Sequence, residues 1–183
     1  LLAALYAAGI VPVWLIARAG RIDVGEYLLP TTWHAHEMVF GYSMAVVAGF
    51  LLTAAENWTQ LTTAKGWLLA ALCVAWIVGR VAPLLGGVLP GTAIAVARLA
   101  FLPLLTIAVG RVVVLARSRR NYGLVVVLVA LLGAQILTHV GALRGSILWQ
   151  TAGPRLGVGL IVVIILVIGG RVIPMFTKNA TKA

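Results

Sequence analysis

Residues Trp33–Thr59 read WHAHEMVFGYSMAVVAGFLLTAAENWT, and the rest of the chain is interpreted around this stretch. It begins with two of the three histidines of the protein and with Glu37, and it continues as a strongly apolar segment. Ionisable groups within a membrane helix are costly to bury and generally mark a functional site. The stretch therefore predicts a membrane helix whose first turns form a ligand-binding site.

The composition is that of an integral membrane protein. The chain has 183 residues, of which 62% are hydrophobic and 10% are charged, whereas a soluble domain has about 25% charged residues. Fourteen Lys and Arg against four acidic residues give a net charge of +10, but most of these basic residues sit at the ends of apolar runs, where they anchor helices in the lipid bilayer. The sequence has no basic patch interleaved with aromatic residues, so nucleic acid is not an expected partner. The single cysteine, Cys73, excludes a disulfide framework and a CxxCH haem attachment site.

Six apolar segments follow one another along the chain. They cover residues 1–17, 35–55, 66–85, 92–115, 122–143 and 156–175. Runs this long and apolar form helices, because a helix satisfies its own backbone hydrogen bonds inside the bilayer. We therefore predict an all-α fold, a polytopic transmembrane helix bundle with about six spans that forms a single domain over residues 1–183. Both ends of the chain lie beside apolar segments, so we expect this domain to be the N-terminal half of a longer protein.

Counting the spans places the polar residues relative to the membrane. The arginine-rich loop at residues 117–120 favours the cytoplasmic side for that end of the bundle. The residues that then share the outer face are His34, His36, Glu37, Arg80, Arg98 and His139. Trp58 and Arg171 share the opposite face. This grouping depends on the number of spans alone, so it holds for either orientation.

Three imidazoles at similar depth are candidate ligands for a metal or a haem, because neutral imidazole is a common metal ligand. A haem without thioether links would need one or two axial histidines, and its propionates would favour arginines. We expect His36 and His139 to ligate the haem, with His34 as a second ligand or a metal ligand. Arg80 and Arg98 are the expected propionate partners.

The spacing of His34 and His36 limits what these two residues do together. They are two residues apart, which is about 200° around a regular helix. Either His34 precedes the helix or the two imidazoles bind different partners.

Structural roles are open for the same side chains. His36 fits a helix cap or a headgroup contact, and His139 fits a polar link between helices. Glu37 is as suited to pairing with Arg80 or Arg98 as to carrying a proton.

Two other functions compete with metal binding. A transporter or permease would use Glu37, Arg80, Arg98 and Gln135 to line a polar path through the membrane. A structural or assembly subunit of a respiratory complex is the third possibility. The sequence leaves open whether the protein is an enzyme.

Three motifs resemble the NnrS family: TWHAHEMVFGY (32–42), GFLLTAAENWT (49–59) and GGRVIPMFT (169–177). Its members are polytopic proteins of the bacterial inner membrane that contain haem and copper and are linked to the nitric oxide response. The resemblance covers most of the chain. It implies a non-covalent haem, copper as a further metal, nitric oxide as the small ligand, and a role in nitrosative stress. It also implies a whole protein about twice this length with about twelve spans, and it assigns no ligand among the histidines.

Overall fold

The fold is a bundle of helices. The computed structural model describes residues 2–22 and 27–181, apart from the side chains of Met175 and Asn179. Within this part of the chain the regular structure is helical and no strand occurs. The prediction of an all-α fold is therefore confirmed.

Five helical stretches among the described residues are long and apolar enough to cross a membrane. They are Pro30–Thr59, Trp67–Leu85, Gly91–Leu115, Arg119–Leu143 and Ile147–Lys178. A shorter apolar helix, α1 (Leu2–Arg18), precedes them. All six predicted apolar segments are thus helical, and the polytopic bundle is confirmed with five helices of span length. Helix α1 has 17 residues, fewer than the about 20 that a full span needs.

The first long stretch combines two kinds of helix. It consists of α2 (Pro30–His36), the π-helix η1 (Glu37–Ser43) and α3 (Met44–Thr59). The sequence predicted one helical segment at residues 35–55, and the structure shows that Glu37–Ser43 within it is a π-helix. A π-helix is usually no longer than a single turn and is frequent at functional sites.

Side chains from another helix stabilise this π-helix. The carbonyl of Gly41 accepts a hydrogen bond from Trp76 Nε1 at 3.1 Å, and the carbonyl of Phe40 accepts one from Arg80 Nη1 at 3.1 Å. Within the segment, the Ser43 hydroxyl donates to the carbonyl of Met38 at 2.8 Å. These external donors lie far away in sequence, which is why local pattern alone did not reveal the π-helix.

The remaining helices differ from the predicted segments in two places. They are α4 (Trp67–Val81), η2 (Ala82–Leu85), α5 (Gly91–Leu99), α6 (Phe101–Leu115), η3 (Arg119–Asn121), α7 (Tyr122–Leu143) and α8 (Ile147–Thr181). The segment predicted at 92–115 divides at Ala100, with Pro103 near the start of α6. The last helix begins at Ile147 rather than at residue 156. Pro154 therefore lies inside this helix and not in the loop before it.

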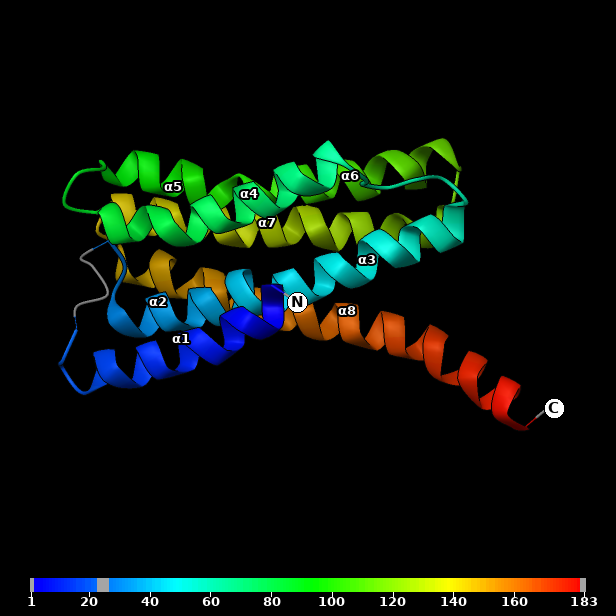
Figure 1. The fold of residues 1–183 in the computed structure, drawn as a ribbon, viewed down its shortest axis with the longest axis horizontal. Helices are drawn as coiled ribbons and strands as arrows, with labels where there is room; N and C mark the ends of the chain where they lie inside the picture. Colours follow the sequence, from blue (N-terminus) through cyan, green and yellow to red (C-terminus); the bar gives the residue numbers. More distant parts are fainter. Residues whose placement is uncertain (1, 23–26, 182–183) are drawn as a thin grey trace.

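Figure 1 shows α4–α7 on one side of the bundle and α1 and α2 on the other, while α3 runs across towards the end of α6 and the C-terminal part of α8 diverges from the other helices. Before that point α8 packs closely along α7. A Cβ atom added at Gly153 would lie 1.9 Å from Thr138 Oγ1, and one added at Gly141 would lie 2.2 Å from the backbone nitrogen of Gln150. Small residues let membrane helices approach this closely.

The interior of the bundle is apolar over most of its length. The fully buried side chains of this core include Met44, Leu51, Leu105, Leu128 and Leu131. Many large apolar side chains on the outside of the bundle are exposed, as expected for helices that face lipid. The buried ionisable side chains among the described residues gather where α2 and η1 meet α5 and α7.

Candidate functional site

Glu37 is the centre of this buried polar region. It is the first residue of η1 and only 2% exposed. Its Oε1 lies 2.8 Å from Arg98 Nη2, and its Oε2 lies 3.1 Å from Arg80 Nε. The hydroxyl of Tyr6, from α1, donates a hydrogen bond to Oε2. Three helices distant in sequence therefore meet at one carboxylate.

The charges around Glu37 do not balance. Two guanidinium groups, Arg80 and Arg98, face a single carboxylate. Transferring an ion from water into a low-dielectric interior costs several kcal/mol. Removing one partner of a buried ion pair destabilises a protein by about 3–5 kcal/mol, because the other charge is then uncompensated. The region therefore carries an excess positive charge, which favours an anionic or electron-rich ligand nearby.

His36 connects Glu37 to α7. Its side chain is fully buried, and Nδ1 lies 3.2 Å from Arg98 Nη1. The same Nδ1 lies 3.4 Å from Glu37 Oε1, so it faces both a guanidinium donor and a carboxylate acceptor. On the other side of the ring, the side-chain amide nitrogen of Gln135, a donor, lies 3.5 Å from Nε2 of His36. Gln135 in turn donates to the carbonyl of Arg98 at 3.0 Å.

One ring nitrogen of His139 contacts a tyrosine hydroxyl, and the other has no hydrogen-bond partner among the described residues. Its Nδ1 lies 3.0 Å from the hydroxyl of Tyr27, and the two rings stack at 5.7 Å. Burial raises the pKa of Tyr27 to about 12, so the phenol remains neutral and its hydroxyl is able either to donate to Nδ1 or to accept from Nδ1–H. Nε2 of His139 is buried and has no hydrogen-bond partner in the described part of the chain. We call the buried group Tyr6, His36, Glu37, Arg80, Arg98, Gln135 and His139 the Glu37 cluster.

Five of the six predicted site residues come together in this cluster, and His34 does not. Its imidazole stacks on the indole of Trp14 with ring centroids 4.4 Å apart and an interplanar angle of 12°. His36 instead contacts His139, with ring centroids 5.1 Å apart and an interplanar angle of 65°. His34 and His36 both lie in α2, a regular helix, so their side chains face different neighbours.

A haem ligated by His36 and His139 on its two faces does not fit this arrangement. Two axial imidazoles lie on opposite sides of the macrocycle, whereas these two rings touch edge to face. Within the residues that the structure describes, no group of three or more His, Cys, Asp or Glu side chains is arranged to hold a metal ion. The donor atom that does fit a metal is Nε2 of His139, which is buried and free while Tyr27 holds the other nitrogen. Metal-ligating histidines commonly have this second hydrogen bond.

Arg80 and Arg98, the predicted propionate partners, are held within the cluster. Glu37 contacts both guanidinium groups. Arg80 also donates to the carbonyl of Phe40, and Nη1 of Arg98 lies 3.2 Å from Nδ1 of His36. Each arginine is therefore already fixed by protein groups on one side.

Sequence reasoning missed the two tyrosines of the site. Tyr6 lies in the middle of an apolar helix, where a buried phenol needs a partner, and this signal was available. Tyr27 lies outside the apolar segments, and nothing local connects it with His139, which is 112 residues away. Gln135 was named only as a polar group on a transport path, but it is one helical turn from His139 and bridges to Arg98.

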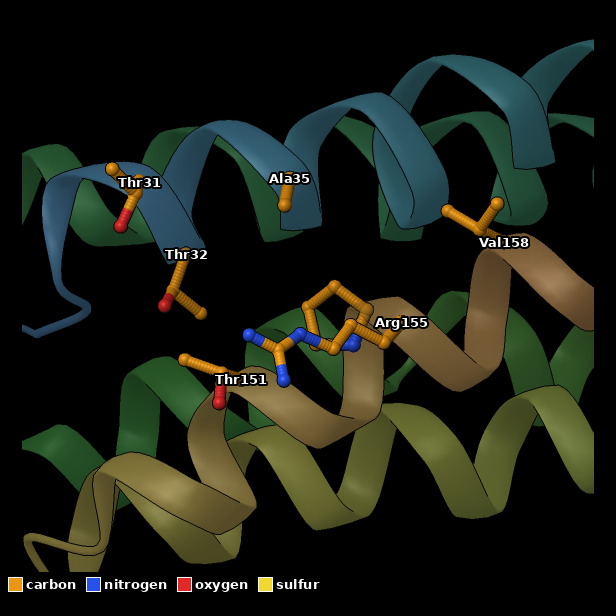
Figure 2. Close-up of a pocket in the computed structure, with 7 residues that line it drawn as sticks. Thr31, Thr32, Ala35, Thr151, Arg155 and Val158 are labelled. Atoms are coloured by element: carbon orange, nitrogen blue, oxygen red, sulfur yellow. The ribbon is translucent and has the colours of Figure 1, made fainter.

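A cavity lies between α2 and α8. This cavity has a volume of about 220 Å³ and is lined by Thr31, Thr32, Ala35, Thr151, Pro154, Arg155 and Val158. Figure 2 shows the Arg155 side chain extending from α8 towards Thr32 and Thr151. None of these residues belongs to the Glu37 cluster, so the cavity is a separate site.

Comparison with known proteins gives a single assignment. No curated protein and no solved structure matches the chain significantly. The sequence profile of the family described as NnrS protein matches residues 1–183, which is the entire chain. With its membrane-length helices and its buried polar cluster, the chain belongs to the NnrS family.

Proposed function

We propose that this chain binds a redox metal through Nε2 of His139 and acts in the bacterial response to nitric oxide. The observation that carries the proposal is the buried Nε2 atom without a partner among the described residues. Leaving a buried polar atom unsatisfied costs about 1–3 kcal/mol, so such an atom calls for an explanation. A metal ion at Nε2 provides one.

Haem iron is the first candidate for the metal, and copper is the second. Imidazole suits both metals, and the family resemblance implies both. Because His36 and His139 touch, and both ring nitrogens of His36 face other protein groups, the proposal assigns His139 alone to hold either metal. When bound, either metal supplies a coordination position for nitric oxide. Nitric oxide is small and uncharged, and we expect it to reach this position through the bilayer of the inner membrane.

The protein groups around His139 have defined tasks in this proposal. The Tyr27 hydroxyl lies 3.0 Å from Nδ1 and orients the imidazole. In the tautomer that would bind a metal, the phenol oxygen accepts from Nδ1–H and Nε2 presents its lone pair. Glu37 holds Arg80 and Arg98 in place. The excess positive charge of these two arginines would stabilise negative charge on a ligand bound beside them. The apolar core around the cluster excludes water.

The test uses the complete protein in membranes and after purification. We expect a haem absorption band, bound copper or both in the wild type, and loss of the metal in His139→Ala. His34→Ala is the matched control, since His34 stacks on Trp14 outside the cluster and its removal leaves Nε2 of His139 unchanged. Metal retained at wild-type stoichiometry, with an unchanged spectrum, in His139→Ala contradicts the assignment. The absorption spectrum and elemental analysis together distinguish haem iron from copper.

The excess charge of the Glu37 cluster favours one other function, transport of a small anion. Two buried arginines against one carboxylate, beside a π-helix, would suit a transient anion site. Metal-free protein in proteoliposomes should then take up nitrite, and Arg98→Gln should abolish the uptake. Uptake that is absent from metal-free vesicles, together with bound metal in the purified protein, favours the metal-binding function.

A further inference from the structure

A basic pocket lies at the end of the bundle opposite the Glu37 cluster. It has a volume of about 560 Å³ and is lined by Trp58, Ser118, Arg120, Asn121, Arg171 and Val172. Trp58 is 21 residues after Glu37 in the same helical stretch, which corresponds to about 30 Å along a helix. The pocket joins two motifs of the sequence, ENWT and GGRVIP, that the proposed function does not use.

The guanidinium group of Arg171 is held firmly at the wall of this pocket. It lies over the indole of Trp58 at 5.5 Å from the ring centroid. Nη1 donates to the side-chain oxygen of Asn121, and Nη2 donates to the carbonyl of Arg120 at 2.7 Å. Asn121 is itself buried and donates to Ser118 Oγ at 2.9 Å. Since a guanidinium has five N–H donors, these two hydrogen bonds leave three N–H groups of Arg171 without a hydrogen bond to the described protein groups.

The positive charge of the pocket has no carboxylate partner among the described residues. The acidic residues that the structure describes are Glu37 and Glu56. Glu37 pairs with arginines at the other end of the bundle, and Glu56 pairs with Lys65 Nζ at 2.7 Å. Arg120 and Arg171 therefore face the same pocket with like charge, and an anion would relieve their repulsion.

The lining of the pocket matches the chemistry of a phosphate group. Guanidinium groups bind phosphate oxygens through paired N–H donors, and the hydroxyl of Ser118 is a further donor. The indole of Trp58 suits the depth of lipid headgroups. Between the pocket and the middle of α8, Ile165 and Leu166 are exposed apolar side chains along which acyl chains would lie.

We propose that this pocket binds a phosphate group, as carried by the headgroup of an anionic phospholipid. Basic pockets between transmembrane helices recognise such headgroups. The proposal is independent of metal binding at His139, because the two sites share no residue and lie at opposite ends of the bundle.

Thermal unfolding of the full protein in nanodiscs tests this site. We compare discs of phosphatidylcholine alone with discs that also contain phosphatidylglycerol, and we expect the anionic lipid to raise Tm by about 3 °C or more. Arg120→Gln should lose most of this shift. Arg120 is exposed, so its replacement should leave the fold intact, and Arg171→Gln provides a second test within the pocket.

Arg111→Gln is the matched control, because it removes an exposed arginine near the end of α6 that does not line the pocket. This variant should keep the wild-type shift. Inorganic phosphate added to phosphatidylcholine discs separates the two sources of the group: an Arg120-dependent shift with phosphate alone assigns the site to the free anion. The proposal is overturned if neither probe shifts the wild type, or if Arg111→Gln loses as much of the shift as Arg120→Gln.

Discussion

Glu37 Oε1 and Arg98 Nη2 form an ion pair of 2.8 Å in which the two side chains are 2% and 1% exposed. The pair joins the first residue of the π-helix to α5, and Arg80 of α4 contacts the other oxygen of the same carboxylate. A buried pair is not strongly stabilising in itself, but breaking it leaves a buried charge without compensation. Glu37 is therefore the residue on which the stability of the cluster depends.

Glu37→Gln is expected to lower the free energy of unfolding by about 3–5 kcal/mol, because it leaves two buried guanidinium groups without a carboxylate. Unfolding of the purified protein in mixed detergent micelles measures this loss. Glu56→Gln is the control: Glu56 is 31% exposed and pairs with Lys65, so its replacement should cost less than about 1 kcal/mol. Equal losses in the two variants would contradict the central role of Glu37.

A double-mutant cycle tests the pair itself. Arg98→Met should also destabilise the protein, since it removes the nearer guanidinium from Glu37. The double variant Glu37→Gln/Arg98→Met should lose less stability than the sum of the two single variants, by about 0.5–3 kcal/mol. Strict additivity would mean that the two side chains act independently.

The π-helix is expected to depend on Trp76. Trp76→Phe keeps an aromatic ring but removes the Nε1–H that donates to the carbonyl of Gly41 at 3.1 Å. The loss should be about 1–3 kcal/mol, because a buried acceptor loses its donor. Amide hydrogen exchange across η1 should also become faster. Trp67→Phe is the control, since Trp67 is 80% exposed; exchange in η1 that is equally fast in both variants would contradict this role.

The count of apolar segments was enough to predict which residues share one end of the bundle. It placed His36 and His139 together although 103 positions separate them, because each helix that crosses the membrane reverses the direction of the chain. In the same way it placed Trp58 and Arg171 at the opposite end, where the two side chains are in contact. These are consequences of topology, and they do not depend on the details of packing.

The contacts inside the cluster required the structure. The π-helix depends on donors from α4, so no local pattern at Glu37–Ser43 predicts it. The contact between Tyr27 and His139 joins a residue between two helices to a residue within another. Periodicity gives the face of a helix, but it does not give the partner that packs against it.

Tyr27→Phe tests the proposed role of the phenol in orienting His139. The variant removes the hydroxyl that lies 3.0 Å from Nδ1 and keeps the stacked ring. Loss of a hydrogen bond to a metal-ligating histidine typically weakens metal binding by about 10–100-fold. Titration of metal or haem into the depleted full-length protein measures the change. Tyr42→Phe, at an exposed position, should bind as the wild type does; equal affinities for all three proteins would remove Tyr27 from the site.

Gly153→Ala tests the close contact between α7 and α8. The added Cβ would lie 1.9 Å from Thr138 Oγ1 and 2.3 Å from the carbonyl oxygen of Ala134, so the helices must separate. We expect a loss of about 1–3 kcal/mol, the usual cost of overpacking, measured by unfolding in detergent. Gly159→Ala is the control on the same helix, since nothing lies within 4 Å of its Cβ. There alanine should be neutral or stabilise by up to about 1 kcal/mol through helix propensity, and a loss at both positions would show that α8 tolerates neither substitution for reasons other than contact with α7.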